Sequence, residues 1–157
     1  MEFVSDSSTI QQAQIDSNYD ISVYLNSLSE DEEERKKIFE NYMLSNAGYS
    51  VATFLLAVGD RHLENLMLSK NGKMWHLDFG FILGKNPPGK GVFVPKIRIN
   101  QHMVKGLGGM ESEGYEKFVD KTIEAFLHLR KHRVLIINLI ALMADASIEN
   151  LPKEETV

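Results

Sequence analysis

The sequence contains no cysteine, which excludes a disulfide framework and any zinc site built on cysteine. It also lacks an apolar run of the roughly twenty residues that span a bilayer, because Asn138 interrupts the longest such run, residues 134–144. Its first residues have neither the basic nor the apolar region of a signal peptide. These absences favour an intracellular location. The formal net charge of -5 argues against nucleic acid as a partner of the chain as a whole.

Acidic residues are absent between Phe79 and Met110, although residues 30–34 form a dense acidic run. A positive segment within an acidic protein predicts an anionic partner. The alternative is a solvated loop that its lysines keep soluble. We favour the anionic partner, because the segment begins where the motif described below ends. The basic residues of this window are Lys85, Lys90, Lys96, Arg98 and Lys105.

A chain of 157 residues suffices for one domain with a moderate core. Residues 1–4 have the composition of the end of a strand. Residues 5–18 are so rich in Ser, Gln, Asp and Asn that they predict a loop or a weakly ordered connector.

Apolar spacing predicts several helices. The capping box Ser29-x-x-Glu32 predicts a helix start, with the acidic run in the first turn, where the helix dipole favours it. Apolar residues then recur at intervals of three and four over residues 38–58, which predicts one long helix, or two that meet near Gly48. A similar stripe over residues 115–127 predicts another helix. Residues 134–143 are apolar almost all round and predict a buried helix.

A β-hairpin is predicted over residues 66–77. Two short apolar segments flank Asn71-Gly72, and Asn-Gly favours a tight hairpin turn because both of its central positions need positive φ. Such a hairpin brings Asn65 and Asp78, at its two open ends, close together. This is how residues thirteen apart in sequence could share a metal ion.

The most informative motif is Gly59-Asp60-Arg61-His62-Leu63-Glu64-Asn65, which the hairpin joins to Asp78-Phe79-Gly80. Phosphoryl transfer needs acidic and amide oxygens around Mg²⁺ and a group that orients the attacking hydroxyl. Asn65 and Asp78 supply those ligand types, so they are the candidate metal ligands. A protein kinase has H-R-D-x-x-x-x-N before D-F-G. Here the Asp-to-Asn interval is the same, but the triplet is inverted.

The proton acceptor could be Asp60 or His62. The spacing points to Asp60, which occupies the place of the protein-kinase base. An imidazole, however, is a better base near neutral pH than an exposed carboxylate. For Arg61 we expect a structural role as an ion-pair partner. No H-E-x-x-H spacing is present, which argues against a zinc site at the other histidines.

Together these residues resemble the phosphatidylinositol 3-/4-kinase superfamily. The resemblance rests on Asp60-Arg61-His62-x-x-Asn65 and on His76-Leu77-Asp78-Phe79-Gly80. It extends to Ala47-Gly48-Tyr49, to Phe81-Ile82-Leu83-Gly84, to Ala125-Phe126-Leu127-His128-Leu129-Arg130 and to Leu142-Met143-Ala144-Asp145-Ala146. These segments look most like class III phosphatidylinositol 3-kinase, the endosomal and autophagic lipid kinase. The resemblance covers nearly the whole chain and is weakest over residues 5–34.

The resemblance implies an α+β, mostly helical fold: the C-terminal lobe of a two-lobed protein-kinase-like catalytic domain. Residues 1–157 would be a piece of that domain, with a hinge strand at 1–4, a catalytic loop at 59–65 and an activation loop at 78–100. The N-terminal lobe and the final C-terminal helices would be missing. We therefore expect this piece alone to be inactive, because a half-site cannot enclose ATP.

The resemblance also assigns the site. His62 would be the base, with Asp60 in support. Met67 and Leu77, which composition alone places in the core, would form the apolar floor under the adenine ring, and the hinge residues Phe3 and Val4 would bind the adenine edge. ATP and Mg²⁺, or Mn²⁺, are the implied cofactors. The loop that selects the lipid headgroup carries scattered rather than clustered basic residues, which fits unphosphorylated phosphatidylinositol: Lys85, Lys90, Lys96 and Arg98.

The implied reaction transfers the γ-phosphate of MgATP to the 3-hydroxyl of phosphatidylinositol in membranes, in endosomal trafficking and autophagy. The implied partners are regulatory kinase-like and coiled-coil subunits. The implied location is cytoplasmic and peripheral on endosomal and autophagic membranes. Three alternatives stay open: a phosphatidylinositol 4-kinase, a related protein kinase that shares Gly-Asp-Arg-His and Asp-Phe-Gly, and a non-catalytic scaffold. The loop is longer around residues 89–91 and less proline-rich than in class III enzymes. This departure concerns which headgroup the loop selects and not the assignment as a kinase.

Overall fold

The structure of the chain is a computed structural model that describes residues 4–88, 97 and 99–142. Its described part is mostly helical, with one small antiparallel sheet, so the predicted α+β class is confirmed. The elements in chain order are β1 (Ser7–Thr9), α1 (Ile10–Asp16), α2 (Ile21–Ser27), α3 (Glu32–Leu55), the 3₁₀ turn η1 (Leu63–Asn65), β2 (Leu66–Ser69), β3 (Met74–His76), α4 (Gln101–Gly106), α5 (Glu113–Lys131) and α6 (Arg133–Leu142).

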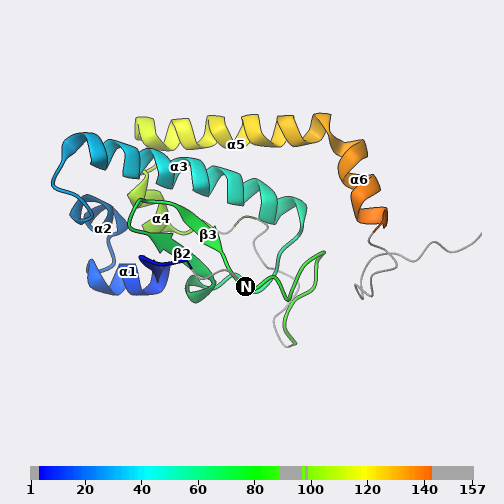
Figure 1. Ribbon diagram of the computed structural model, residues 1–157, viewed down its shortest axis with the longest axis horizontal. Helices are drawn as coiled ribbons and strands as arrows, with labels where there is room; N and C mark the ends of the chain where they lie inside the picture. Colours follow the sequence, from blue (N-terminus) through cyan, green and yellow to red (C-terminus); the bar gives the residue numbers. More distant parts are fainter. Residues whose placement is uncertain (1–3, 89–96, 98, 143–157) are drawn as a thin grey trace, which may run out of the picture.

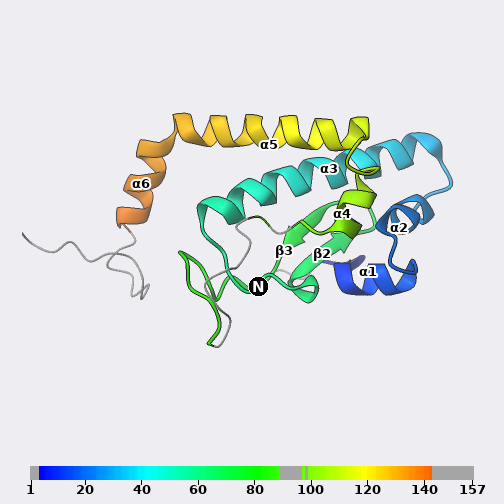
Figure 2. The same ribbon diagram turned by 180° about the vertical axis from the view of Figure 1, so that it is seen from behind.

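The long helix α3 lies at the centre of three layers. Helix α5 runs along one side of it and the sheet lies on the other, as both views show (Figures 1 and 2). Helix α1 packs against β2, and α2 packs against α4. The buried core between these elements consists of Ile10, Ala13, Ile21, Leu25, Ile38, Tyr42, Met43, Ala47, Leu66, Leu68, Met74, Met103, Leu107 and Phe118.

Helix α3 is continuous through Gly48, so the single-helix alternative is confirmed. Its cap lies two residues later than the capping box predicts. The Asp31 carboxylate accepts a hydrogen bond from the amide of Glu33 at 3.2 Å, whereas Ser29 accepts one from the amide of Asp31 at 3.1 Å. Asp31 thus satisfies a helix amide that would otherwise lack a partner, and Ser29 orders the residues before it.

The predicted hairpin is confirmed as strands β2 and β3, and β1 adds a third strand beside β2. The turn between β2 and β3 is pressed against α3, where Asn41 donates a hydrogen bond to the Asn71 carbonyl at 2.9 Å. Gly72 has φ +84°, and a Cβ on it would lie 2.1 Å from the Ile38 carbonyl oxygen. Both its backbone angle and the close approach require glycine there.

The prediction of a loop over residues 5–18 is wrong, because this segment forms β1 and α1. Thr9 caps α1 by accepting a hydrogen bond from the amide of Gln12 at 3.1 Å. The helix buries Ile10, Ala13 and Gln14 and exposes most of its polar residues. Two apolar residues at helical spacing are enough to dock such a short helix, and the polar composition conceals them.

The helix predicted over residues 134–143 is present as α6, but its predicted burial is wrong. No residue of α6 is buried, and Ile137 and Leu142 are 61% and 81% exposed. Figure 1 shows why: at the end of α5 the chain turns, and α6 extends away from the layers. Met143 lies outside the described residues. None of the described helices has both the length and the apolarity to cross a bilayer.

Candidate active site

The predicted catalytic loop, residues 59–65, begins shortly after α3 and folds back on the carbonyl of Asp60. Asp60 has φ +49°, a conformation uncommon for residues other than glycine. Its carbonyl oxygen accepts hydrogen bonds from the side-chain amide of Asn65 at 2.9 Å and from the backbone amide of His62 at 3.3 Å. Because the Asn65 Nδ2 is engaged in this way, its Oδ1 is the amide atom left to bind a cation.

The hairpin brings its two open ends together, as the sequence predicts. The backbone amide of Leu77 donates a hydrogen bond to the carbonyl of Asn65 at 2.8 Å, one residue before Asp78. Asp78 also adopts a positive φ, +52°, and its exposed carboxylate accepts a hydrogen bond from the amide of Gly80 at 3.1 Å. Two non-glycine residues in left-handed conformations thus occupy the two halves of the motif, and such outliers are enriched at functional sites.

Arg61 joins the two halves of the motif. The side chain is only 5% exposed, and its Nε donates a hydrogen bond to the Gly59 carbonyl at 2.8 Å. Its two terminal nitrogens donate to the carbonyl oxygens of Leu77 and Asp78. Burial lowers the pKa of Arg61, and the negative charges of Asp78 and Asp60 oppose that shift. The expected structural role is therefore present, but the hydrogen-bond acceptors are backbone carbonyls.

His62 and His76 lie in different environments. The side chain of His62 is 45% exposed, and its Nδ1 lies 3.8 Å from the Glu64 carboxylate, beyond hydrogen-bond distance. His76 is buried and stacks on Tyr49 of α3, with ring centroids 5.0 Å apart. Burial, assisted by the positive charge of Arg61, lowers the pKa of His76 to about 4. His76 is therefore neutral near pH 7 and has a structural role.

Met67 and Leu77 are not core residues, contrary to the prediction from composition. The buried face of the hairpin carries Leu66, Leu68 and Met74, whereas Met67 is half-buried and Leu77 is 41% exposed. Trp75 pairs with Met67 across the sheet and is half-buried on the same face. Strand alternation places Trp75 on the same face as the two predicted adenine contacts, and this period of two is a sequence signal for a third contact.

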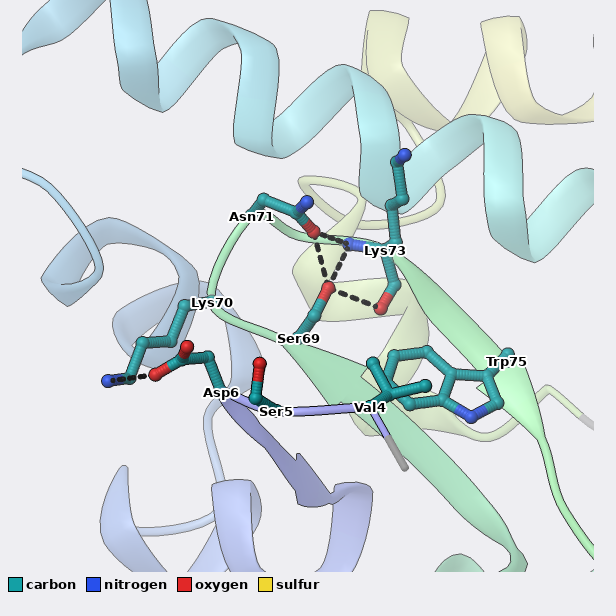
Figure 3. A pocket seen from close by; sticks show the side chains of 8 residues that line it. All are labelled: Val4, Ser5, Asp6, Ser69, Lys70, Asn71, Lys73 and Trp75. Carbon is teal, nitrogen blue, oxygen red and sulfur yellow. Dashed lines mark hydrogen bonds and ion pairs between the residues drawn. The ribbon is translucent and has the colours of Figure 1, made fainter. Parts of the chain in front are cut away.

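A hollow of about 670 Å³ lies at the edge of this apolar face (Figure 3). Val4, which is 44% exposed and outside any strand, and Trp75 form one side of it. At the other side Lys70 pairs with the Asp6 carboxylate at 3.0 Å. Its lining residues are Val4, Ser5, Asp6, Ser69, Lys70, Asn71, Lys73 and Trp75. The hollow therefore borders the predicted nucleotide face and not the catalytic loop, and Phe3 lies outside the described residues.

Of the four predicted headgroup contacts, only Lys85 lies within the described residues. It is half-buried at the start of the loop, and its amide donates a hydrogen bond to the Ile82 carbonyl at 3.2 Å. Lys90, Lys96 and Arg98 lie outside the described residues. The contacts of these residues with a headgroup stay a prediction.

The donor set suits a hard divalent cation. Within the described residues, no three His, Cys, Asp or Glu side chains gather into a metal-binding group. Asn65 and Asp78 offer one amide oxygen and one carboxylate, and Mg²⁺ commonly takes few protein ligands together with substrate phosphates and water. The residues present thus fit Mg²⁺, while the roles of His62, Asp60, Asn65 and Asp78 stay predictions.

Comparison with known proteins gives the family. The family model "Phosphatidylinositol 3- and 4-kinase" matches residues 5–152. The chain is 45% identical over 120 residues to phosphatidylinositol 3-kinase pik3 of Schizosaccharomyces pombe, covering 75% of this chain and 15% of that protein. It is 45% identical over 114 residues to phosphatidylinositol 3-kinase VPS34 of Candida albicans, covering 73% and 11%. It is 42% identical over 117 residues to phosphatidylinositol 3-kinase catalytic subunit type 3 of Caenorhabditis elegans, covering 74% and 13%.

The chain thus spans 11–15% of the length of these relatives. The family match includes all of the described elements, so the predicted C-terminal lobe of a kinase-like domain is confirmed together with its family. The hairpin lies between the inverted Asp-Arg-His triplet and Asp-Phe-Gly, as the Asn-Gly turn and the apolar spacing predict. The chain belongs to the phosphatidylinositol 3- and 4-kinase family.

Proposed function

We propose that this chain forms the catalytic lobe of a class III phosphatidylinositol 3-kinase, which transfers the γ-phosphate of ATP to the 3-hydroxyl of phosphatidylinositol. One observation supports the proposal above all others. Arg61 binds the carbonyls of Leu77 and Asp78 and so joins the loop of Asp60, His62 and Asn65 to Asp78. Phosphoryl transfer depends mainly on such positioning of charged and polar groups.

Asn65 and Asp78 would hold Mg²⁺ or Mn²⁺, which would neutralise charge on the phosphates. The hydrogen bond from Asn65 Nδ2 to the Asp60 carbonyl orients the amide for this role. The Asp78 carboxylate is exposed and held at one oxygen by the amide of Gly80, so it can meet a solvated ion. Hydrogen bonds to backbone atoms would thus hold the side chains of Asn65 and Asp78 in place for the metal ion.

His62 would accept the proton of the attacking hydroxyl. Its Nδ1 is shielded from solvent and has no hydrogen-bond partner within the described residues, while the ring as a whole is half-exposed. Nε2 is therefore the nitrogen that would take the proton. Asp60 would orient the hydroxyl or the imidazole, since both side chains leave the same tight loop.

The adenine ring would lie on Met67 and Leu77, beside Trp75, with the backbone of Phe3 and Val4 at its edge. The partial exposure of these apolar side chains supports the assignment, because an apolar sheet face open to solvent is a suitable surface for a flat ring. The positive window that contains Lys85, Lys90, Lys96 and Arg98 would receive the anionic headgroup. We further propose that the reaction takes place on endosomal and autophagic membranes, with regulatory subunits bound.

The test is a chimera. In S. pombe phosphatidylinositol 3-kinase pik3, the segment that matches this chain is replaced by its counterpart from this chain. The chimera is incubated with labelled ATP, Mg²⁺ and phosphatidylinositol vesicles, and the position of the phosphate on the inositol ring is determined. A peptide mixture serves as an alternative acceptor, and unmodified pik3 serves as the control.

The proposal predicts phosphatidylinositol 3-phosphate as the product, without peptide labelling. A 4-phosphate would instead identify a phosphatidylinositol 4-kinase lobe, and labelled peptide would identify a protein kinase. A chimera that folds, binds MgATP and labels no acceptor would favour the scaffold.

A further inference from the structure

The segment that leaves α3 is bonded to the start of the predicted substrate loop. The amide of Gly59 donates to the Phe81 carbonyl at 2.7 Å, and the amide of Leu83 donates to the Leu56 carbonyl at 2.7 Å. The amide of Gly84 donates to the Ala57 carbonyl at 3.0 Å. Three backbone hydrogen bonds thus fasten residues 81–84, which follow Asp-Phe-Gly, to residues 56–59, which precede Asp60.

Gly59 leaves room for the next turn of this loop. A Cβ on Gly59 would lie 2.3 Å from the backbone carbonyl oxygen of Lys85 and 2.7 Å from Oδ1 of Asn86. The Asn86 Oδ1 is itself shielded from solvent and has no hydrogen-bond partner within the described residues. A contact of 2.3 Å with backbone cannot be relieved by rotating a side chain. Position 59 therefore requires glycine because a side chain has no room there. Its backbone angle does not require glycine, since φ lies outside the left-handed region.

The two fastened segments also contain left-handed residues. Ala57 and Leu83 have φ of +45° and +55°, and Gly84 has φ +86°. A conformation of this kind costs of the order of 1 kcal/mol or more for a residue with a side chain, and it persists only where the surroundings enforce it. The three hydrogen bonds and the close approach at Gly59 provide that enforcement.

We propose that Gly59 is a positioning residue that sets where the substrate loop begins relative to the catalytic loop. Gly59 directly precedes Asp60. The carbonyl that packs against Gly59 belongs to Lys85, the first basic residue of the acid-free segment between Phe79 and Met110. A side chain at position 59 displaces Lys85 from the catalytic loop and leaves the hairpin in place. The functional part of this inference rests on the proposed lipid kinase activity, whereas its structural part does not.

Amide hydrogen exchange on the chain itself tests the structural part. In the wild-type chain, the amides of Leu83 and Gly84 should be protected, because both are hydrogen-bonded to the segment before Gly59. In Gly59→Ala, exchange at these two amides should accelerate by roughly tenfold or more, because their hydrogen bonds to residues 56 and 57 are broken. The amide of Leu77, bonded to Asn65 inside the hairpin, should keep its protection.

Two further variants sharpen the result. Gly48→Ala is the matched control, because a Cβ on Gly48 meets nothing within 4 Å and exchange at Leu83 and Gly84 should not change. Gly59→Ala combined with Asn86→Ala removes one of the two obstructing atoms but leaves the Lys85 carbonyl, so the fast exchange should persist. The proposal would be overturned if the double variant regained the protection of the Leu83 and Gly84 amides. It would also be overturned if these two amides exchanged freely in the wild-type chain. Free exchange of Leu83 and Gly84 in the wild-type chain would overturn the proposal even if Gly59→Ala does not fold.

The functional part is tested in the pik3 chimera. Gly59→Ala should lower kcat/KM for phosphatidylinositol by roughly tenfold to a hundredfold, because a displacement of about 1 Å near a reacting group can cost about a hundredfold. The KM for ATP should change little, and Gly48→Ala should change neither constant. Equal losses for lipid and ATP would contradict a role in the substrate loop. A wild-type chimera that folds, binds MgATP and phosphorylates no acceptor would refute the proposed function, and the predicted exchange pattern would leave the structural inference standing.

Discussion

The guanidinium of Arg61 donates a hydrogen bond to the backbone carbonyl of Asp78, so a buried cation of the predicted catalytic loop holds the far end of the hairpin. The same side chain binds the carbonyls of Gly59 and Leu77. Only arginine offers several N–H groups in a fixed planar fork, and a buried carbonyl left without a donor is costly. Arg61 therefore stabilises the arrangement of the site as well as the fold.

The first prediction concerns this fork. Arg61→Lys should lower the free energy of unfolding by about 2–3 kcal/mol, because one ammonium group cannot reach all three carbonyls. Urea denaturation of the chain measures the change. Arg35→Lys is the matched control: Arg35 also donates to two carbonyls, those of Ser29 and Glu30, but it is partly exposed, so its loss should cost less than about 1 kcal/mol. Equal effects of the two substitutions would contradict the account.

The second prediction concerns pH and His76. The pKa of His76 is about 4 in the folded chain and about 6.5 in an unfolded one, so between these values the unfolded chain binds a proton that the folded chain does not. Stability should therefore fall as the pH falls from about 6.5 to 4, by up to roughly 3 kcal/mol from this residue. His76→Phe keeps a ring beside Tyr49 and should remove this part of the slope.

Unfolding by urea between pH 7.5 and 4 compares the two proteins. Carboxylates titrate in both of them, so the difference between the two curves isolates His76. Curves that stay parallel over the whole range would show that His76 is not held neutral by burial.

The third prediction assigns the base. In the pik3 chimera, His62→Ala should cut turnover of phosphatidylinositol by roughly a hundredfold to ten-thousandfold, the range typical for loss of a general base. The KM for ATP should stay close to that of the unsubstituted chimera. If Asp60→Asn proves crippling and His62→Ala mild, the two roles are exchanged.

The fourth prediction concerns the positive window. Replacing Lys85, Lys90, Lys96 and Arg98 together by Gln should raise the KM for phosphatidylinositol and flatten its dependence on salt, because charges there attract an anionic headgroup and salt screens that attraction. The KM for ATP should change little. Lys117→Gln, at an exposed lysine of α5, is the control. The unsubstituted chimera should prefer phosphatidylinositol over its 4,5-bisphosphate, and comparable turnover of both would contradict the class III assignment.

Much of the site is predictable because its signals are local. The turn Asn71-Gly72 and the alternating apolar residues around it predict the hairpin, and the hairpin in turn places Asn65 next to the strand that leads to Asp78. The role of Arg61 is not predictable in the same way. Its acceptors are backbone carbonyls that come together only after the hairpin closes, and backbone positions have no signature in a sequence.

The errors have two causes. Apolar periodicity shows that α6 is a helix, but burial depends on which elements pack against it, and none of the described ones covers it. Conversely, α1 is short and polar, yet Ile10 and Ala13 are fully buried because the sheet and η1 lie beside them. Met67 and Leu77 are assigned to the core by composition, but strand alternation places them on the opposite face. Tertiary packing decided the cases of α6 and α1, and strand alternation decided the case of Met67 and Leu77.

The central claim is that Asn65 and Asp78 form the metal-binding pair of a working lipid kinase site. Its most direct measurement is the turnover of phosphatidylinositol by the pik3 chimera and by its Asp78→Asn variant, at matched MgATP concentrations, with the exposed Glu116→Gln as the control. We predict that Asp78→Asn loses at least about a hundredfold to a thousandfold in turnover, as expected when a group that stabilises transition-state charge is removed, while Glu116→Gln retains full activity. Near-normal turnover by Asp78→Asn would contradict the account.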